Sequence, residues 1–282
     1  MTDLDRRLHP YRKNLAAKYL RGKIESDLFV AGQQRQICKG HAPLKRSPDP
    51  TAPLDTELLF GELVQLYDER DGWSWIQSEL DGYVGYAENH MITETLLAPT
   101  HTVIMPATYL YPAPDLKLIP NDWLPMNAQV NVSDSIEKYS NLASGGWVFS
   151  AHLARINKPA LDHCEVAQMF LYSPYLWGGK TCVGIDCSGL LQISLARCNK
   201  QIPRDSDMQM DTGQPIEYDG DERVLQRGDL VFWRDHAGIW IDSQSFIHAN
   251  ATNMLVTVER LNDVAAQIVA DSGDTILSVR RV

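Results

Sequence analysis

The sequence predicts an α+β protein in which a strand-rich first part precedes a segment that runs from helices into a sheet. Up to about residue 158, short β-patterned runs alternate with glycine and proline turns. Beyond that point, residues 161–171 and 187–195 carry apolar side chains at helical spacing, and five strand-like runs follow. Helices grouped ahead of strands are typical of an α+β domain.

Composition restricts the classes of partner. The 282 residues suffice for two or three domains with cores of their own, and 44% hydrophobic with 22% charged residues is ordinary for a globular chain. The formal net charge of −10 argues against nucleic acid and anionic membrane as partners, and it leaves the oligomeric state open. No run approaches the ~18 apolar residues of a membrane-spanning helix.

The cysteines favour a reducing compartment. Their odd number, irregular spacing and lack of a C-x-x-C pair do not indicate a disulfide framework. The five are Cys38, Cys164, Cys182, Cys187 and Cys198. The charged first residues lack the apolar core of a secretory signal. We therefore expect a cytoplasmic protein, or a periplasmic one if the true start lies elsewhere.

The first 158 residues divide into three segments. Residues 1–25 are basic and form an arm, which we expect to be a solvated lead-in or an extended strand-like segment. Residues 26–95 hold strand-like runs at 63–67, 73–77 and 83–86 with Asp-Gly turns between them, which predicts a small barrel. Residues 96–158 predict a second barrel, with strands at 102–104, 116–119, 128–132 and 146–149 between prolines.

The remaining segment, residues 159–282, contains the candidate chemistry. Its predicted strands lie at 224–232, 237–241, 245–248, 255–259 and 275–279. The motif GIDCSGL at 184–190 places Asp186 as the N-cap of a helix and Cys187 in its first turn. Unpaired N–H groups and the helix dipole favour an anion there, so we expect the pKa of this thiol to be lowered.

Two histidines lie on strand-like runs downstream of the cysteine. His236 begins the run HAGIW, and His248 lies twelve residues later, on a strand that can pair with the first. A cysteine followed by two such histidines has the order of a nucleophile, a base and a group that orients the base. A zinc site built from Cys187, His236 and His248 is disfavoured, because zinc ligands usually include two within a few residues. We expect no metal and no cofactor.

Several further motifs accompany these residues: YLWGG at 175–179, PRDS at 203–206, RGDLVF at 227–232 and FIHA at 246–249. Together, in this order, they resemble the NlpC-type cysteine peptidases, which cut bacterial cell-wall peptides and share a papain-like core. The resemblance covers about residues 160–282. The runs around 58–62, 71–73 and 82–86 resemble the bacterial SH3 signature.

The resemblance implies an arrangement for the whole chain. Two small SH3-like β-barrels, at 26–95 and 96–158, precede a papain-like cysteine peptidase domain at 159–282. That order is similar to the γ-D-glutamyl-L-diamino acid endopeptidases. It implies hydrolysis of murein peptides of the form L-Ala-γ-D-Glu-diamino acid during murein recycling, with the muropeptide as the partner.

The resemblance also assigns roles to residues. His236 is the general base for Cys187, and His248 orients it. Tyr175 lines the site and holds the oxyanion or the substrate, unless it only packs in its loop. The N–H of Cys187 is a candidate oxyanion donor.

Further substrate contacts follow from the same resemblance. Asp186, besides capping the helix, meets the free N-terminal amine of the ligand, and Ser188 flanks the nucleophile. Ser206 and Arg204 line the cleft, where Arg204 meets a peptide carboxylate or serves as a structural ion-pair partner.

In the first SH3-like segment, Glu62 matches a glutamate that binds the same amine. Tyr83 or Tyr86 matches a nearby tyrosine, and the sequence does not decide between them. Two carboxylates around one ammonium would demand a free amine and exclude the intact polymer.

Two other functions fit the same motifs. One is a peptidoglycan-binding module with an inactive peptidase domain, which the intact Cys187, His236 and His248 disfavour. The other is an acyltransferase on the same core, which differs in whether water or an amine takes the acyl group.

Overall fold

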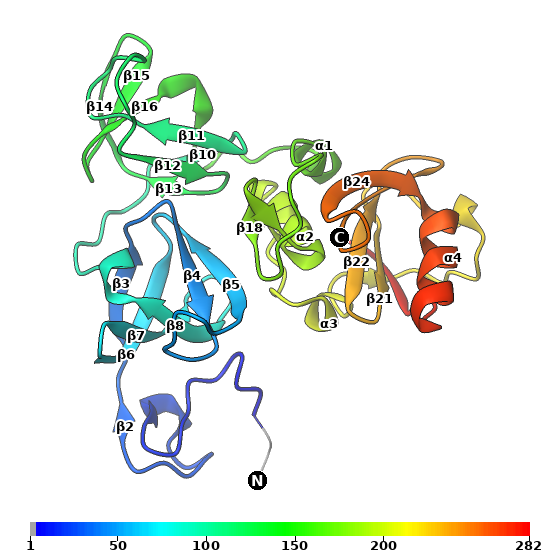
Figure 1. Cartoon of the computed structure of the whole chain (residues 1–282), viewed down its shortest axis with the longest axis horizontal. Coiled ribbons are helices and arrows are strands. Elements are labelled where there is room, and N and C mark those ends of the chain that lie inside the picture. The colour runs from blue at the N-terminus through cyan, green and yellow to red at the C-terminus, as the bar shows by residue number, and fades with distance from the viewer. Residues whose placement is uncertain (1–3) are drawn as a thin grey trace. The chain divides into compact units, whose positions relative to one another are not determined.

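The computed structural model describes residues 4–282, so the first three residues of the predicted arm lie outside the described part of the chain. The chain forms two compact units, the first ending at Ile156 and the second spanning Asn157–Val282 (Figure 1). Each contains a sheet of its own. Within residues 4–282, no helix is long and apolar enough to cross a membrane.

The first unit is built around a seven-stranded antiparallel sheet with the strand order β5-β4-β8-β7-β6-β3-β9. Its strands are β3 (Gln33–Ile37), β4 (His41–Lys45), β5 (Leu54–Leu59), β6 (Leu63–Arg70), β7 (Trp73–Ser78), β8 (Val84–Glu88) and β9 (Ile92–Thr93), with a 3-10 turn, η2 (Asn89–Met91). The predicted Asp71-Gly72 turn joins β6 to β7, and both residues have positive φ angles of 51° and 84°.

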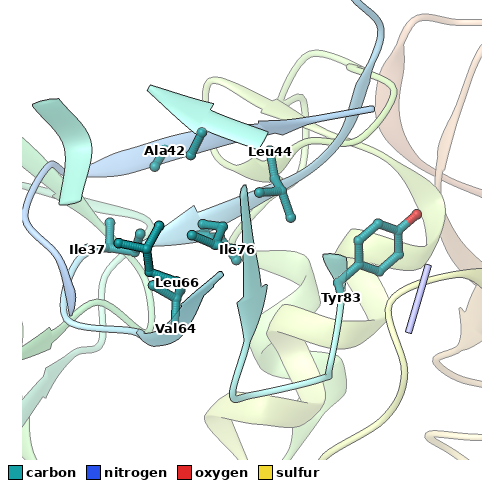
Figure 2. Packing of buried hydrophobic residues seen from close by; sticks show 9 residues of the cluster. Ile37, Ala42, Leu44, Val64, Leu66, Ile76 and Tyr83 are labelled. Atoms are coloured by element: carbon teal, nitrogen blue, oxygen red, sulfur yellow. The ribbon is translucent and has the colours of Figure 1, made fainter. Parts of the chain in front are cut away.

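One apolar cluster lies inside this sheet. Alternate residues of the strands, among them Leu44, Val64 and Ile76, are fully buried against one another. Figure 2 shows Tyr83 at the edge of the cluster, with its hydroxyl pointing away from the other labelled side chains. Burial of these side chains is the main stabilising term for the sheet.

The basic arm packs on this sheet, so the prediction of a solvated lead-in is wrong. Its elements are β1 (Ala16–Ala17) and η1 (Lys18–Leu20), and β1 pairs in parallel with β2 (Phe29–Val30), which follows the arm. The Arg12 guanidinium lies 4.1 Å from the centre of the Trp75 ring and donates to Tyr86 Oη at 2.9 Å. A charged side chain on an aromatic face, with its stem covered, is stabilised by packing as well as by charge.

Residues 96–156 form three small antiparallel sheets. Their elements are β10 (His101–Val103), β11 (Ala107–Leu110), β12 (Asp122–Pro125), β13 (Gln129–Val130), β14 (Val132–Ile136), β15 (Tyr139–Leu142), β16 (Trp147–Phe149), η3 (Ser150–His152) and β17 (Leu153–Arg155). The strand predicted at 116–119 is wrong. That run is an exposed loop between β11 and β12, because prolines on both sides leave it no pairing partner.

The second unit confirms the predicted passage from helices into a sheet. The elements before the sheet are α1 (His163–Gln168), the hairpin β18 (Lys180–Thr181) and β19 (Gly184–Ile185), α2 (Cys187–Arg197) and α3 (Ser206–Gln209). The sheet has the order β20-β25-β21-β22-β23-β24. Its strands are β20 (Gln214–Pro215), β21 (Leu230–Trp233), β22 (His236–Trp240), β23 (Ser245–Asn250), β24 (Leu255–Arg260) and β25 (Ser278–Arg281).

Two parts of this unit differ from prediction. The strand expected at 224–232 begins only at Leu230, because the 3-10 turn η4 (Glu222–Val224) and a turn at Gly228 precede it. Helix α4 (Leu261–Ser272) was not predicted. Leu261 and Val264 of α4 pack on one side of the sheet, while α2 contacts β22 and β23, and Figure 1 shows the two helices on opposite sides.

Candidate active site

Cys187 is the first residue of α2, as the sequence predicted. The β18–β19 hairpin leads directly into it, and the Asp186 side chain caps the helix by accepting from the N–H of Gly189 at 2.7 Å. A β-carbon at Gly189 would lie 2.3 Å from the carbonyl oxygen of Gly179, so only glycine lets that loop approach the helix start. The thiol is therefore held between a helix end and a glycine loop.

The environment of the sulfur differs from the prediction. Burial raises the pKa of the Cys187 thiol to about 12, and the nearby Asp186 carboxylate adds to this effect. The backbone N–H groups of Ala237 and Ser188 bond to the sulfur and act in the opposite direction, as does the charge of Arg204. The expectation of a lowered thiol pKa is thus wrong, because loss of hydration outweighs the donors at the helix start.

Both oxygens of the Asp186 carboxylate are occupied. Oδ1 accepts from Gly189 N, from Ser188 Oγ at 3.2 Å and from Arg204 Nη1 at 3.0 Å. Oδ2 accepts from Gly178 N at 2.7 Å and from Arg204 Nη2 at 2.8 Å. The predicted N-cap role is confirmed, but a carboxylate with five such bonds is an unsuitable partner for a ligand amine.

Arg204 is the structural ion-pair partner, which was one of the two roles expected for it. Its side chain is 2% exposed, and besides its two bonds to Asp186 it donates to Ser188 Oγ at 2.7 Å. This burial and the ion pair disfavour the other expected role, the binding of a peptide carboxylate. Ser188 is likewise a structural residue, since its hydroxyl points into this cluster.

The two predicted histidines meet. Nε2 of His236 on β22 lies 2.8 Å from Nδ1 of His248 on β23, and the rings are close to perpendicular, at 70°. The bond from the Ala237 N–H to the sulfur brings the start of β22 to Cys187. The expected contact between the two histidines is thus present, and the start of β22 lies beside the thiol. Because His236 Nε2 bonds to His248, the ring nitrogen left for the thiol is Nδ1.

Both rings are neutral at physiological pH. Burial, with a smaller effect of the neighbouring His248, lowers the pKa of His236 to about 3. Burial also lowers the pKa of His248, against the opposing influence of Glu259. A neutral thiol beside a neutral imidazole requires that the proton move as the sulfur attacks, rather than beforehand.

The remaining predicted residues lie in different surroundings. Tyr175 lies in the loop before β18, half-buried; burial raises the pKa of its hydroxyl, and the Cys187 and Asp186 charges contribute to the shift. Ser206 is half-buried at the start of α3. Glu62 is buried in the turn between β5 and β6, and Tyr83 belongs to the apolar cluster of the first unit. Their roles in substrate binding stay predictions.

Glu259 on β24 was not predicted as a residue of the site. Its Oε2 lies 2.7 Å from Nε2 of His248, on the side of that ring away from His236. The alternating apolar and polar residues at 255–259 predicted a strand. A single glutamate on a strand does not indicate that it contacts a histidine on the neighbouring strand. Only the pairing of β23 with β24 brings the two side chains together.

A metal centre finds no support in the geometry. Among residues 4–282, no group of three or more His, Cys, Asp or Glu side chains is arranged to hold a metal ion. The facing nitrogens of His236 and His248 bond to each other, so they are not directed at a shared ion.

Two segments of the chain match known protein families. Residues 172–270 match the NlpC/P60 family, and residues 44–92 match the bacterial dipeptidyl-peptidase Sh3 domain. A crystal structure of an NlpC/P60 family protein from Bacillus cereus has a TM-score of 0.75 at 21% identity, over 88% of this chain and 99% of that one. This likeness shows a shared fold.

Curated relatives carry related names. A γ-D-glutamyl-L-lysine dipeptidyl-peptidase of Bacillus subtilis is 24% identical over 233 residues, which cover 74% of this chain and 77% of the relative. Dipeptidyl-peptidase 6 of Lysinibacillus sphaericus is 25% identical over 84% of this chain and 95% of its own length. The probable endopeptidase NlpC of Escherichia coli is 38% identical, but over only 28% of this chain and 54% of the relative.

Replacing Arg204 by methionine should destabilise the second unit. Asp186 would then be a buried charge without its partner, a change that typically costs about 3–5 kcal/mol. Denaturant unfolding measures the loss, and Arg197→Met, at the far end of α2 where the side chain bonds to the Lys158 carbonyl, should cost about 1 kcal/mol or less. Equal losses for the two variants would contradict a special role of the Asp186–Arg204 pair.

The pH dependence of Cys187 alkylation tests the neutral thiol. Because its pKa lies near 12, the reactive thiolate is a small fraction at pH 5–9 that grows about tenfold per pH unit. In His236→Asn, which has no base to take the proton, the alkylation rate by iodoacetamide should therefore climb across this range without levelling, as followed on the Cys187 peptide by mass spectrometry. In the wild type the neutral His236 takes the proton during attack, so the rate should change little between pH 5 and 9. A plateau in His236→Asn that begins below pH 7 would contradict a thiol pKa near 12.

Proposed function

We propose that this chain, which carries an NlpC/P60 domain and a bacterial SH3 domain, is a cysteine peptidase that hydrolyses the γ-D-glutamyl–L-diamino acid bond of murein peptides. One observation carries the proposal: Cys187 begins α2 with the Ala237 N–H on its sulfur, and His236, the residue before Ala237, is hydrogen-bonded to His248. This arrangement can deprotonate a thiol and return the proton to a leaving group.

The reaction begins as the Cys187 sulfur attacks the carbonyl carbon of the γ-glutamyl bond. Its proton passes to Nδ1 of His236, and the carbonyl oxygen becomes an oxyanion. The N–H groups at the start of α2 and the Tyr175 hydroxyl are the proposed donors to that oxyanion. Tyr175 suits a donor, because burial raises the pKa of its hydroxyl and keeps it protonated.

Collapse of this intermediate breaks the C–N bond. The diamino acid leaves as an amine that takes the proton from His236, and a thioester to Cys187 remains. Water then attacks the thioester with His236 again as the base, which releases L-Ala-D-Glu and restores the thiol. The names of the Bacillus relatives, γ-D-glutamyl-L-lysine dipeptidyl-peptidases, support this choice of bond.

Recognition of a free N-terminal amine needs a carboxylate other than Asp186. We propose Asp205 for it. Arg204 ties the loop 203–206 to the helix start, and Asp205 is the next residue of that loop.

Murein recycling in the cytoplasm is the proposed setting. All five cysteines are free thiols, as expected in a reducing compartment. Fractionation of the native host, with the protein detected by antibody, tests the location. Recovery in a periplasmic or extracellular fraction would refute it.

Defined peptides test the reaction. L-Ala-γ-D-Glu-L-Lys and the corresponding meso-diaminopimelate peptide should yield L-Ala-D-Glu and the free diamino acid by mass spectrometry. Cys187→Ala should yield neither, because no thioester can form. Binding without products in the wild type would indicate the peptidoglycan-binding module, and transfer to an added amine in preference to water would indicate an acyltransferase.

The N-terminal amine should control the rate. A charge-assisted contact is worth about 1.5–3 kcal/mol, so N-acetylation of the peptide should lower kcat/KM by about 10–100-fold. Asp205→Asn should remove most of this difference by slowing the free-amine peptide, while Asp211→Asn, further along the same segment, should leave it unchanged. Equal rates for free and acetylated peptides in the wild type would contradict amine recognition.

A further inference from the structure

We infer that Glu259 is a positioning residue that fixes the tautomers of His248 and His236, and so presents Nδ1 of His236 to Cys187 as the base. The inference deepens the proposed function and rests on it for the role of His236. It uses only side chains of the second unit, which three neighbouring strands bring together: β22, β23 and β24.

Strand register places Glu259 beside His248. His248 pairs with Thr257, and Phe246 pairs with Glu259, so all four side chains lie on the same face of the sheet. Glu259 is thus the diagonal neighbour of His248 across the two strands. A glutamate side chain is long enough to span the distance between diagonal neighbours. The 2.7 Å contact between Oε2 and Nε2 is the result.

The hydrogen bonds can be assigned in order from Glu259. Its neighbours His248 and Thr257 lower the pKa of the Glu259 carboxyl despite its partial burial, so it is a carboxylate that only accepts. Nε2 of His248 must then carry the proton and donate. In a neutral ring the other nitrogen, Nδ1, is an acceptor, so Nε2 of His236 must donate to it across 2.8 Å. The lone pair of His236 is left on Nδ1.

The carboxylate itself is held in place. Thr257 Oγ1 donates to Glu259 Oε2 at 2.8 Å, and Asn250 Nδ2 donates to Thr257 Oγ1 at 2.7 Å. Asn250 Nδ2 also lies 3.3 Å from His248 Nε2, a longer contact than that of Glu259. The shorter contacts select the arrangement in which Asn250 supports Thr257 and Glu259 receives the His248 proton.

The negative charge has a further effect during the reaction. When His236 takes the thiol proton it becomes cationic in a half-buried position, where lost hydration makes a charge costly. Polarisation through His248 toward Glu259 offsets part of that cost, as a carboxylate does for the imidazolium of a catalytic triad. The role resembles that of an orienting carboxylate, but one histidine further from the nucleophile.

The same structure offers a matched control. His236, His248, Glu259 and two acidic residues of α4, Asp263 and Asp271, line one cavity of about 370 Å³. Asp263 has the same charge in the same cavity and is not part of the hydrogen-bond chain. Glu259→Gln and Asp263→Asn therefore change the charge of the cavity equally, and only the first alters the hydrogen bonds to His248.

Nuclear magnetic resonance of the histidine side chains tests the tautomers without substrate. Long-range ¹H–¹⁵N spectra, assigned with His236→Asn and His248→Asn, should show both rings of the wild type protonated on Nε2. Glu259→Gln should give a mixture of tautomers, because a carboxamide can accept from or donate to His248. Asp263→Asn should leave the spectra unchanged. Wild-type rings protonated on Nδ1, or unaltered spectra for Glu259→Gln, would overturn the inference.

Reactivity provides a second readout. Glu259→Gln should lower kcat for the murein peptide and the rate of Cys187 alkylation at pH 7 by about 10–100-fold, with KM within about twofold. Glu259→Asp keeps the negative charge but has a shorter side chain. Its kcat and its alkylation rate should lie between those of the wild type and of Glu259→Gln. Thermal unfolding checks that each variant is folded. A wild type without peptidase activity would refute the proposed function, while tautomers and alkylation would still decide the role of Glu259. If Cys187 in Glu259→Gln were alkylated as fast as in Asp263→Asn, the positioning role of Glu259 would be refuted.

Discussion

The buried pair of Asp186 and Arg204 is the interaction on which the rest of the site depends. One carboxylate caps α2, holds the N–H of Gly178 and anchors the loop 203–206 through Arg204. The position of Cys187 and of two loops beside it is therefore set by a single side chain. Burying such a pair is unfavourable unless every hydrogen-bonding site is filled, and here both carboxylate oxygens are fully engaged.

The electrostatics follow from the same burial. Loss of hydration keeps the thiol protonated and the imidazole neutral, so the substrate-free site holds no thiolate–imidazolium pair. In the proposed reaction, new charge appears only during attack, at the oxyanion and at His236. The groups arranged around these positions, N–H donors on one side and the chain from His248 to Glu259 on the other, are preorganised for that moment.

The sequence predicted correctly those features that depend on interactions between residues close together in the chain. The Asp186 cap, the helix start at Cys187 and the Asp71-Gly72 turn each depend on residues within one turn of chain, and all are confirmed. Alternation alone misled at 116–119, where no partner strand exists. The charge of the arm predicted a solvated segment. That prediction was wrong, because Arg12 packs on the ring of Trp75, 63 positions later in the sequence.

The sequence by itself determined which cysteine begins the helix and which two histidines follow it, since their order and their flanking motifs are properties of the chain. Tertiary structure alone decided that Asp186 and Arg204 satisfy each other rather than a ligand. It also decided that Glu259 ends the histidine chain. The reason is that such roles depend on which polar groups become neighbours out of water, and strand register and helix packing fix those neighbours.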